Sequence, residues 1–144
     1  MSTAAEDLIN EVRLLYQSLV QIGDRIHKDS TITLGMRAVL EYLDRNGDTT
    51  VPDMARARRV SRQRIQALVN ALADEALVAA VDNPASRKSP LIHLQPEGAT
   101  TIVEMRRREA RAMQLDVPET ELRQAKRTLE RVRRTLEENA GTSS

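Results

Sequence analysis

The chain has 144 residues, of which 40% are hydrophobic and 30% charged, which is typical of a globular protein with a highly charged surface. Lysine and arginine number 22 and aspartate and glutamate 21, so the net charge of +1 by itself indicates no nucleic-acid partner. The lack of cysteine excludes disulfides and cysteine-ligated metals, and no apolar run or leader indicates a membrane span or signal peptide. We expect a cytoplasmic protein with an aliphatic, mainly helical core.

The first expected helix spans residues 5–28 and carries one narrow apolar stripe. Its hydrophobic residues alternate between spacings of four and three, which keeps them on one side of the helix over about five turns. Such a stripe packs either on the core of its own chain or on another subunit, and its length favours the second. We therefore predict a dimer interface that includes Leu8, Val12, Leu15 and Leu19.

Three more helical segments are expected before residue 76. We predict a helix over residues 34–46, at most a β-bridge at 49–50, and a short helix over 51–58. Ser61 is the clearest helix N-cap of the chain. The helix after it, to about residue 75, has apolar side chains at i, i+3, i+4 and i+7, which we expect to be buried. These residues are Ile65, Leu68, Val69 and Leu72.

The last third of the chain predicts a hairpin and two long helices. Two β-compatible runs, at 77–82 and 91–95, flank a polar loop with turn residues at both ends. Helices are then expected over residues 96–113 and from about 118 to 139. The second of these has another heptad-like stripe, which we assign to the same dimer interface. Its predicted interface residues are Leu122, Leu129, Val132 and Leu136.

The order of short helix, tight turn, capped helix and hairpin is that of a winged helix-turn-helix, whose second helix enters the major groove of DNA. Residues 55–73 hold five arginines and no acid. At 3.6 residues per turn, the helix after Ser61 turns Gln63, Ala67 and Asn70 outward. Amides pair with adenine and arginine with guanine in the major groove. The alternative, a helix whose polar side only faces solvent, is disfavoured by the acid-free basic face.

Other predicted contacts lie at the helix ends and on the hairpin tip. Arg56, Ser61 and Lys88 are assigned to phosphates, because cations and the N–H groups of a helix N-terminus bind anions. Arg87 is expected to probe the minor groove. The full predicted DNA-contacting set is Arg56, Ser61, Arg62, Gln63, Arg64, Gln66, Ala67, Asn70, Arg87, Lys88 and Ser89.

The stretch from Thr50 to Gly98 resembles the MarR family of bacterial transcriptional regulators. The motifs that carry this resemblance are Val60-Ser61-Arg62-Gln63, Leu68-Val69-Asn70-Ala71-Leu72 and Leu94-Gln95-Pro96-Glu97-Gly98. It implies a homodimer with intertwined terminal helices that binds a palindromic operator, usually as a repressor. Many such proteins release DNA when a small molecule binds between their dimerisation and DNA-binding parts. The sequence leaves the effector unknown, and a regulator without an effector is an alternative.

Several positions depart from the pattern of that family. Arg59 lies in the helix-turn-helix turn and Ala76 after the recognition helix, both where the family often has glycine. The wing carries Ala85-Ser86-Arg87-Lys88 in place of an acid-x-Arg-x-x-Arg pattern. The salt bridge usual in the wing is therefore in doubt.

The predicted fold is thus mainly α with a small β-hairpin. A winged helix-turn-helix over residues 33–98 lies between helical dimerisation regions at 1–32 and 99–144. The predicted function is a sequence-specific DNA-binding transcriptional regulator. A helical protein–protein interaction module and a non-specific architectural DNA-binding protein are the alternatives.

Nothing in the sequence indicates an enzyme, a cofactor or a metal site. His27 and His93 lie far apart in different elements, and no nucleophile motif or phosphate-binding glycine loop is present. Most acids have basic neighbours at helical spacing, as Glu104 has in Arg108. The run Arg106-Arg107-Arg108 is expected to be a solvated face, because Glu104 and Glu109 flank it.

Overall fold

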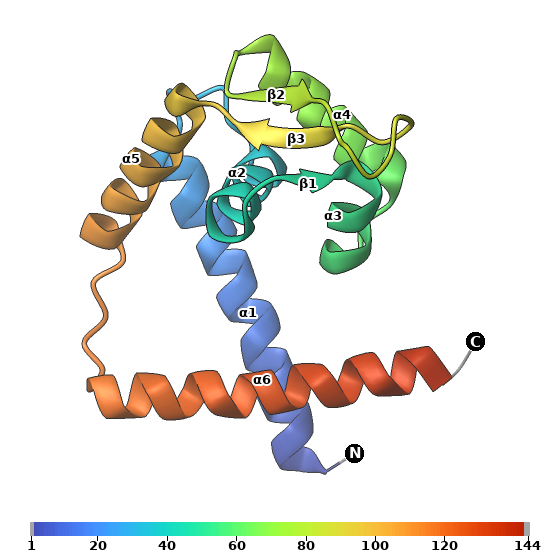
Figure 1. Cartoon of the computed structure of the whole chain (residues 1–144). Helices are drawn as coiled ribbons and strands as arrows, with labels where there is room; N and C mark the ends of the chain where they lie inside the picture. The colour runs from blue at the N-terminus through green and yellow to red at the C-terminus, as the bar shows by residue number, and fades with distance from the viewer. Residues whose placement is uncertain (1, 143–144) are drawn as a thin grey trace. The chain divides into compact units, whose positions relative to one another are not determined.

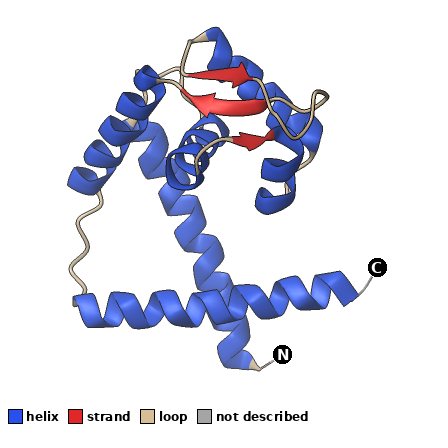
Figure 2. Ribbon diagram, viewed as in Figure 1, coloured by secondary structure: helices blue, strands red, loops and turns tan. Residues whose placement is uncertain are grey.

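Helices make up most of the chain, together with a small sheet (Figures 1 and 2). The computed structural model describes residues 2–142. In chain order, its elements are α1 (Thr3–Ile26), α2 (Leu34–Asn46), β1 (Thr49–Thr50), α3 (Val51–Arg58), α4 (Arg62–Asp74), β2 (Val78–Val81), β3 (Leu91–Leu94), α5 (Pro96–Ala112) and α6 (Glu119–Thr142). The expected fold class is confirmed. The chain divides into two compact units between Ala112 and Met113, so α6 is described by itself.

Four helices of the first unit begin at a side-chain cap, the first of them α1 at Ser2. The hydroxyl of Thr33 accepts a hydrogen bond from the backbone N–H of Met36 at 3.2 Å. The Ser61 hydroxyl accepts from the N–H of Arg64 at 3.1 Å, and Thr50 caps α3 in the same way. Each bond satisfies one of the N–H groups that a helix N-terminus leaves without an intrahelical partner. The sequence patterns at Thr33, Thr50 and Ser61 each predict a helix N-cap, and all three are confirmed.

The hydrophobic core lies between α2, α3, α4, the sheet and the start of α5. Leu40, Met54, Leu72 and Ile102 are fully buried at its centre. One residue differs from expectation: Leu68 packs against the core but is only partly buried. Leu68 lies at the edge of the apolar side of α4, where its methyl groups approach the first turn of α2 at Gly35.

The sheet has three antiparallel strands in the order β1-β3-β2. The predicted hairpin is confirmed, with Val78 opposite Leu94 and Val81 opposite Leu91. The Thr49–Thr50 segment, expected to form at most a bridge, is a short edge strand that pairs with Leu91 and Ile92 of β3. The sheet therefore connects the start of α3 to the hairpin and holds both beside α4 (Figure 1).

Two non-glycine residues on either side of α4 have a left-handed backbone. Arg59 has a φ of 54° and Ala76 a φ of 59°, a conformation that is strained for residues with a side chain. The turns are closed by hydrogen bonds from Val60 N to the Ala55 carbonyl and from Leu77 N to the Leu72 carbonyl, both at 3.0 Å. Glycine adopts a left-handed backbone without this strain. Arg59 and Ala76 are also the two positions at which the MarR resemblance leads one to expect glycine.

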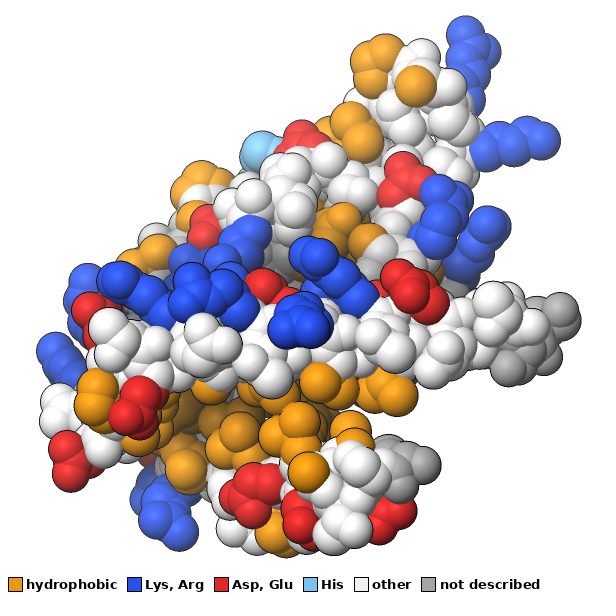
Figure 3. Space-filling view, turned by 90° about the horizontal axis from the view of Figure 1, so that it is seen from below, with side chains coloured by type: hydrophobic (Ala, Val, Ile, Leu, Met, Phe, Trp, Pro, Cys, Tyr) orange, Lys and Arg blue, Asp and Glu red, His pale blue; other side chains and the backbone are white. Residues whose placement is uncertain are grey.

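The long helix α1 packs its C-terminal part against α5 and leaves the middle of its apolar stripe exposed. Val12, Leu15 and Leu19 are 37%, 50% and 43% exposed. Helix α6 likewise contains no buried residue. Exposed hydrophobic side chains are visible on the face shown in Figure 3. No helix within residues 2–142 combines the length and hydropathy needed to cross a membrane.

Candidate nucleic-acid interface

A groove of about 440 Å³ separates the outer face of α4 from the β-hairpin. Its walls come from α3, α4 and the two strands of the hairpin. Seven of its thirteen lining residues are apolar, and the other six carry basic, amide or hydroxyl side chains, with no acid among them. The lining residues are Val51, Pro52, Arg62, Gln63, Gln66, Val69, Asn70, Ala73, Ala80, Lys88, Ser89, Pro90 and Ile92. Such a groove has the chemistry that nucleic-acid phosphates and base edges require.

Helix α4 places its amide side chains on this groove because its other face is held in the core. Ile65, Val69 and Leu72 are buried against α2, α3 and the sheet. Within the exposed face, the Gln66 side chain donates a hydrogen bond from Nε2 to Oδ1 of Asn70, one helical turn later, at 2.9 Å. The base-reading face predicted from the sequence thus carries an internal hydrogen bond that the sequence alone did not indicate.

Six of the predicted DNA-contacting residues share the groove: Arg62, Gln63, Gln66, Asn70, Lys88 and Ser89. The Ser61 hydroxyl is engaged as a cap acceptor, which leaves its O–H free to donate to a phosphate.

The remaining predicted residues lie outside the groove. Arg56 is exposed on α3 and pairs with Asp53 at 3.3 Å. The guanidinium of Arg64 lies beside Gly35, on the side of α4 that faces α2. Ala67 and Arg87 are both exposed, Ala67 on α4 and Arg87 in the hairpin loop.

The hairpin loop is organised by Asn83, one of the turn residues expected at its ends. Asn83 donates from its side-chain amide to the carbonyl of Ser89 at 2.9 Å. Its Oδ1 accepts from the N–H of Ala85 at 3.1 Å, and its carbonyl accepts from Ser86 N at 3.1 Å. Asn83 thus closes the loop that carries Lys88. The Asn-Pro pair was a readable signal, because asparagine side chains form such turns with their own backbone.

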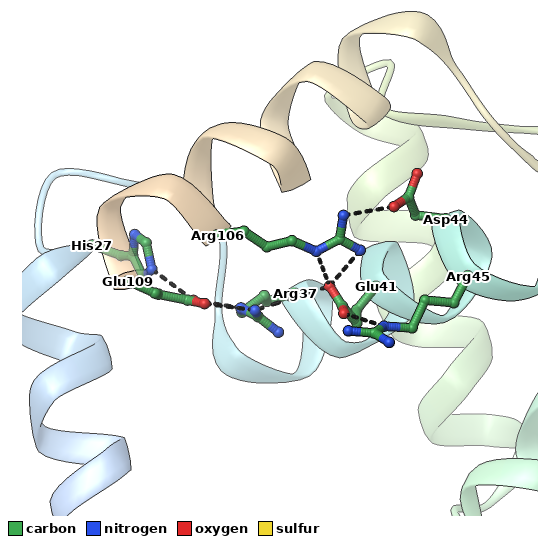
Figure 4. Close-up of polar contacts among 7 residues, drawn as sticks. All are labelled: His27, Arg37, Glu41, Asp44, Arg45, Arg106 and Glu109. Atoms are coloured by element: carbon green, nitrogen blue, oxygen red, sulfur yellow. Dashed lines mark hydrogen bonds and ion pairs between the residues drawn. The ribbon is translucent and has the colours of Figure 1, made fainter. Parts of the chain in front are cut away.

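A polar cluster behind the groove joins α2 to α5 (Figure 4). The Arg106 guanidinium on α5 binds Glu41 at 2.8 Å and Asp44 at 2.7 Å, both on α2. In the opposite direction, Arg37 of α2 donates to both carboxylate oxygens of Glu109 on α5, at 2.5 and 2.6 Å. Three ion pairs, two made by Arg106 and one made by Arg37, therefore set the position of α5 against α2.

The expectation of a solvated run at Arg106-Arg107-Arg108 is wrong for its first member. Arg107 and Arg108 are exposed and pair with Glu104 of their own helix, each at 3.4 Å. Arg106 instead turns toward α2 and is held by two carboxylates there. Because sequence spacing shows neighbours only within one helix, it could not reveal partners that lie more than sixty residues away.

The pKa values of two carboxyl groups in this cluster, Glu41 and Glu109, are lowered from the ordinary range. Burial raises the pKa of Glu109, but the hydrogen bonds from Arg37 and His27 lower it by more. Burial also raises the pKa of Glu41, and the Arg106 and Arg45 guanidinium groups outweigh it, so this pKa too is lowered. Both carboxylates are therefore charged at neutral pH, which favours folding.

The two histidines belong to separate contacts. His27, after the end of α1, lies with Nε2 3.1 Å from Oε1 of Glu109. His93 is on the exposed side of β3, as predicted, with Nδ1 2.8 Å from Oδ1 of Asp48. Over residues 2–142 no group of three or more side chains could hold a metal ion.

Part of the sequence that forms this site is similar to a known family. Residues 37–89 match the model of the MarR family. The match begins in the first turn of α2, covers α3, α4, β2 and the hairpin loop, and ends before β3, so the resemblance seen in the sequence is confirmed over these residues. No curated protein sequence matches the chain significantly.

Solved structures extend the MarR-type fold to nearly the whole chain. A MarR family transcription regulator is 22% identical with a TM-score of 0.81, over 95% of this chain and 93% of that one. BpsR of Bordetella bronchiseptica is 23% identical with a TM-score of 0.74, over 85% and 90%. The reduced form of AbfR, solved bound to DNA, is 18% identical with a TM-score of 0.76, over 94% and 93%. At these identities the likeness establishes the fold.

Proposed function

We propose that the protein is a sequence-specific, double-stranded DNA-binding transcriptional regulator. The observation that carries this proposal is the acid-free groove between α4 and the hairpin, with Arg62 and Lys88 beside three amides. Cations neutralise phosphates, and amides hydrogen-bond base edges. An α-helix fits the width of the major groove. Buried aliphatic residues anchor the inner face of α4, so its polar face is available to enter that groove. AbfR, a protein of similar fold, has been solved bound to DNA, which supports DNA binding by this chain.

We further propose that two copies of the chain bind one pseudo-palindromic operator. The uncovered stripe of α1 and the heptad-like stripe of α6 supply apolar surface for a symmetric partner. A homodimer would place two α4 helices in successive major grooves, about 34–36 Å apart. We assign DNA binding to residues 33–98, and dimerisation to 1–32 and 99–144. Repression and control by a small molecule are implied by the family resemblance and are part of the same proposal. We propose no catalytic role for the protein.

Selection of bound sequences from a random duplex pool tests the proposal. We expect a two-fold symmetric motif whose half-sites are one helical turn apart. Binding of all duplexes with equal affinity would instead indicate an architectural DNA-binding protein. Failure to bind any duplex at low salt would contradict DNA binding and favour a protein–protein interaction module.

A matched pair of lysine variants tests the groove itself by fluorescence anisotropy over a salt series. Lys88→Ala removes a groove cation and should weaken binding to every sequence alike, reducing the salt slope by about 1. Lys28→Ala removes the same charge from the exposed turn after α1 and should leave affinity and slope unchanged. Equal behaviour of the two variants would show that the groove does not bind DNA.

The effector is tested separately. The DNA binding of BpsR is regulated by 6-hydroxynicotinic acid, which supports a trial of small aromatic acids on this chain. We expect one of them to release the labelled operator, and retention of DNA with all of them would indicate a regulator without an effector of this class.

A further inference from the structure

Part of the groove wall opposite α4 is a loop without regular secondary structure. Strand β2 ends at Val81 and β3 begins at Leu91, so the connection is longer than the about two to five residues usual in a hairpin. Lys88, Ser89 and Pro90 of this loop line the groove. Ordering a free loop of this length on binding costs conformational entropy. A ligand of the groove therefore binds more tightly if the loop is already held in place.

Asn83 holds this loop with both ends of its side-chain amide. Its Nδ2 donates to the carbonyl of Ser89 at 2.9 Å, and its Oδ1 accepts from the N–H of Ala85 at 3.1 Å. These partners fix the orientation of the amide, because a carbonyl only accepts hydrogen bonds and a backbone N–H only donates them. The side chain at the start of the loop is thus tied to the backbone at its end.

Each of the two residues joined across the loop precedes a proline. Pro84 follows Asn83, and Pro90 follows Ser89. A proline restricts the residue before it to extended backbone conformations, and the ring fixes the φ of the proline itself. Both ends of the bond therefore have little backbone freedom, and the bond fixes the path of the chain between them.

Lys88 lies directly before the anchored carbonyl. Ser89, which provides that carbonyl, leads through Pro90 into β3. The segment from Asn83 to Pro90 contains no acid that could pair with the Lys88 ammonium group. The position of this cation on the groove therefore depends on the backbone that Asn83 holds.

We propose that Asn83 is a positioning residue for DNA binding, whose amide holds the hairpin loop so that Lys88 reaches a backbone phosphate beside the bases that α4 contacts. The inference rests on the proposed DNA-binding function. Asn83 acts through Lys88 and not through a contact of its own with DNA. Because the loop is ordered before DNA is bound, less entropy is lost on binding.

A double-mutant cycle with Lys88 tests the inference by fluorescence anisotropy on the operator selected from the random duplex pool. Asn83→Ala should weaken binding by about threefold to tenfold for each half-site, the change that corresponds to ordering one long side chain on binding. In the Lys88→Ala background the same substitution should change the affinity by less than about twofold, because the contact that Asn83 positions is already lost.

The salt dependence of binding is a readout that a purely structural role would not change. The slope of log affinity against log salt concentration reflects the number of phosphate charges that the protein neutralises. Asn83→Ala removes no charge, yet it should reduce this slope toward that of Lys88→Ala. A general loss of stability would lower the free energy of unfolding and leave the slope unchanged, so each variant is also measured by urea unfolding.

Asn46→Ala is the matched control. The Nδ2 group of Asn46 also donates to a backbone carbonyl at 2.9 Å, that of Tyr42, but it does so at the end of α2 and not on the groove. Loss of this bond should leave both the affinity for DNA and the salt slope unchanged.

Asn83→Ser separates the bond across the loop from the local turn. A serine hydroxyl can accept from the N–H of Ala85 as it does in similar turns. It is one bond shorter than the asparagine amide and therefore does not reach the carbonyl of Ser89. We expect this variant to bind DNA as weakly as Asn83→Ala.

Four outcomes would overturn the inference while DNA binding stands. They are parent-like binding by Asn83→Ala, equal losses from this substitution with and without Lys88, an unchanged salt slope, and parent-like binding by Asn83→Ser. An unchanged affinity and slope in Lys88→Ala itself would instead contradict the proposed binding of DNA in the groove.

Discussion

The winged unit and helix α1 carry apolar patterns of similar regularity, yet they differ in what covers them. In α4 the residues at i, i+4 and i+7 from Ile65 are buried against α2 and the sheet. In α1 the corresponding stripe leaves Leu15 half exposed, and the helix has no buried residue. Periodicity therefore shows which side of a helix must be covered. It does not show whether the cover comes from the same chain, and four changes test this contrast.

Gly98→Ala should have the largest effect. A Cβ at position 98 would lie 2.1 Å from the backbone carbonyl oxygen of Leu77. Because a backbone atom at the end of the hairpin cannot move aside, we expect a loss of about 3 kcal/mol in the free energy of unfolding, the upper end of the usual overpacking range. Urea unfolding measures it.

Gly23→Ala is the control for that change, because no atom lies within 4 Å of a Cβ at position 23 in α1. It should raise the free energy of unfolding by about 0.5–1 kcal/mol, the usual advantage of alanine over glycine inside a helix. Equal losses in the two variants would contradict the contrast between the closed unit and the open helix.

Leu15→Glu tests whether a second chain covers α1. Burial of a leucine contributes about 1.5–3 kcal/mol, so a charge at this half-exposed position should weaken dimer association by about tenfold or more. Sedimentation velocity over a concentration series measures it. Gln17→Glu, on the polar side of the helix, should leave the association unchanged. A monomeric parent would show that α1 has another role.

Arg106→Ala tests the connection between α2 and α5. The variant leaves Glu41 and Asp44 without this partner. We therefore expect the free energy of unfolding at pH 7 to fall by about 1–3 kcal/mol. The pKa of Glu41 is lowered from 4.5 in the folded protein. The stabilisation is therefore complete above about pH 4.5 and is lost as the pH falls through the lowered pKa. The difference between parent and variant should shrink below that pH.

Arg108→Ala provides the control on the same helix. Its guanidinium is exposed and pairs only at 3.4 Å with Glu104, so we expect a change within about 0.5 kcal/mol at every pH. A difference for Arg106→Ala that stays constant down to acid pH would mean that packing, and not charge, is lost.

Ala76→Gly should have the smallest effect and the opposite sign. Release of the left-handed strain at φ 59° contributes about 1–2 kcal/mol, and the greater freedom of the unfolded glycine removes about half of that. We expect a gain of up to about 1 kcal/mol. Ala67→Gly, in the middle of α4, should instead lose about 1 kcal/mol. Both are measured by urea unfolding, and a loss in both would show that the turn is not strained.

Much of the fold was readable from the sequence because its signals are local. Thr33 and Ser61 cap helices through bonds to residues three positions later, and the hairpin runs and their polar loop are contiguous. At the site, the helical projection of α4 predicted the polar residues of this helix that line the groove. The Asn83 turn is equally local, and the Asn-Pro pair at the start of the loop predicted a turn there.

Other features required contacts between distant segments. The partners of Arg106 on α2, the pairing of Thr49–Thr50 with β3 and the placement of Arg64 beside Gly35 all join residues far apart in the chain. Gln66 and Asn70 are four residues apart on one helix, so their hydrogen bond is compatible with the sequence spacing. That both residues share a groove with Lys88 depends on where the sheet holds the hairpin.

The sequence by itself determined the helices, their caps and the polar side of α4, because backbone hydrogen bonding and apolar periodicity act within a few residues. Only the tertiary structure decided which cations face the groove, which pair with acids of another helix, and which apolar side chains stay open. The reason is that burial and ion pairing depend on distances across the core, and these are set by packing of whole elements.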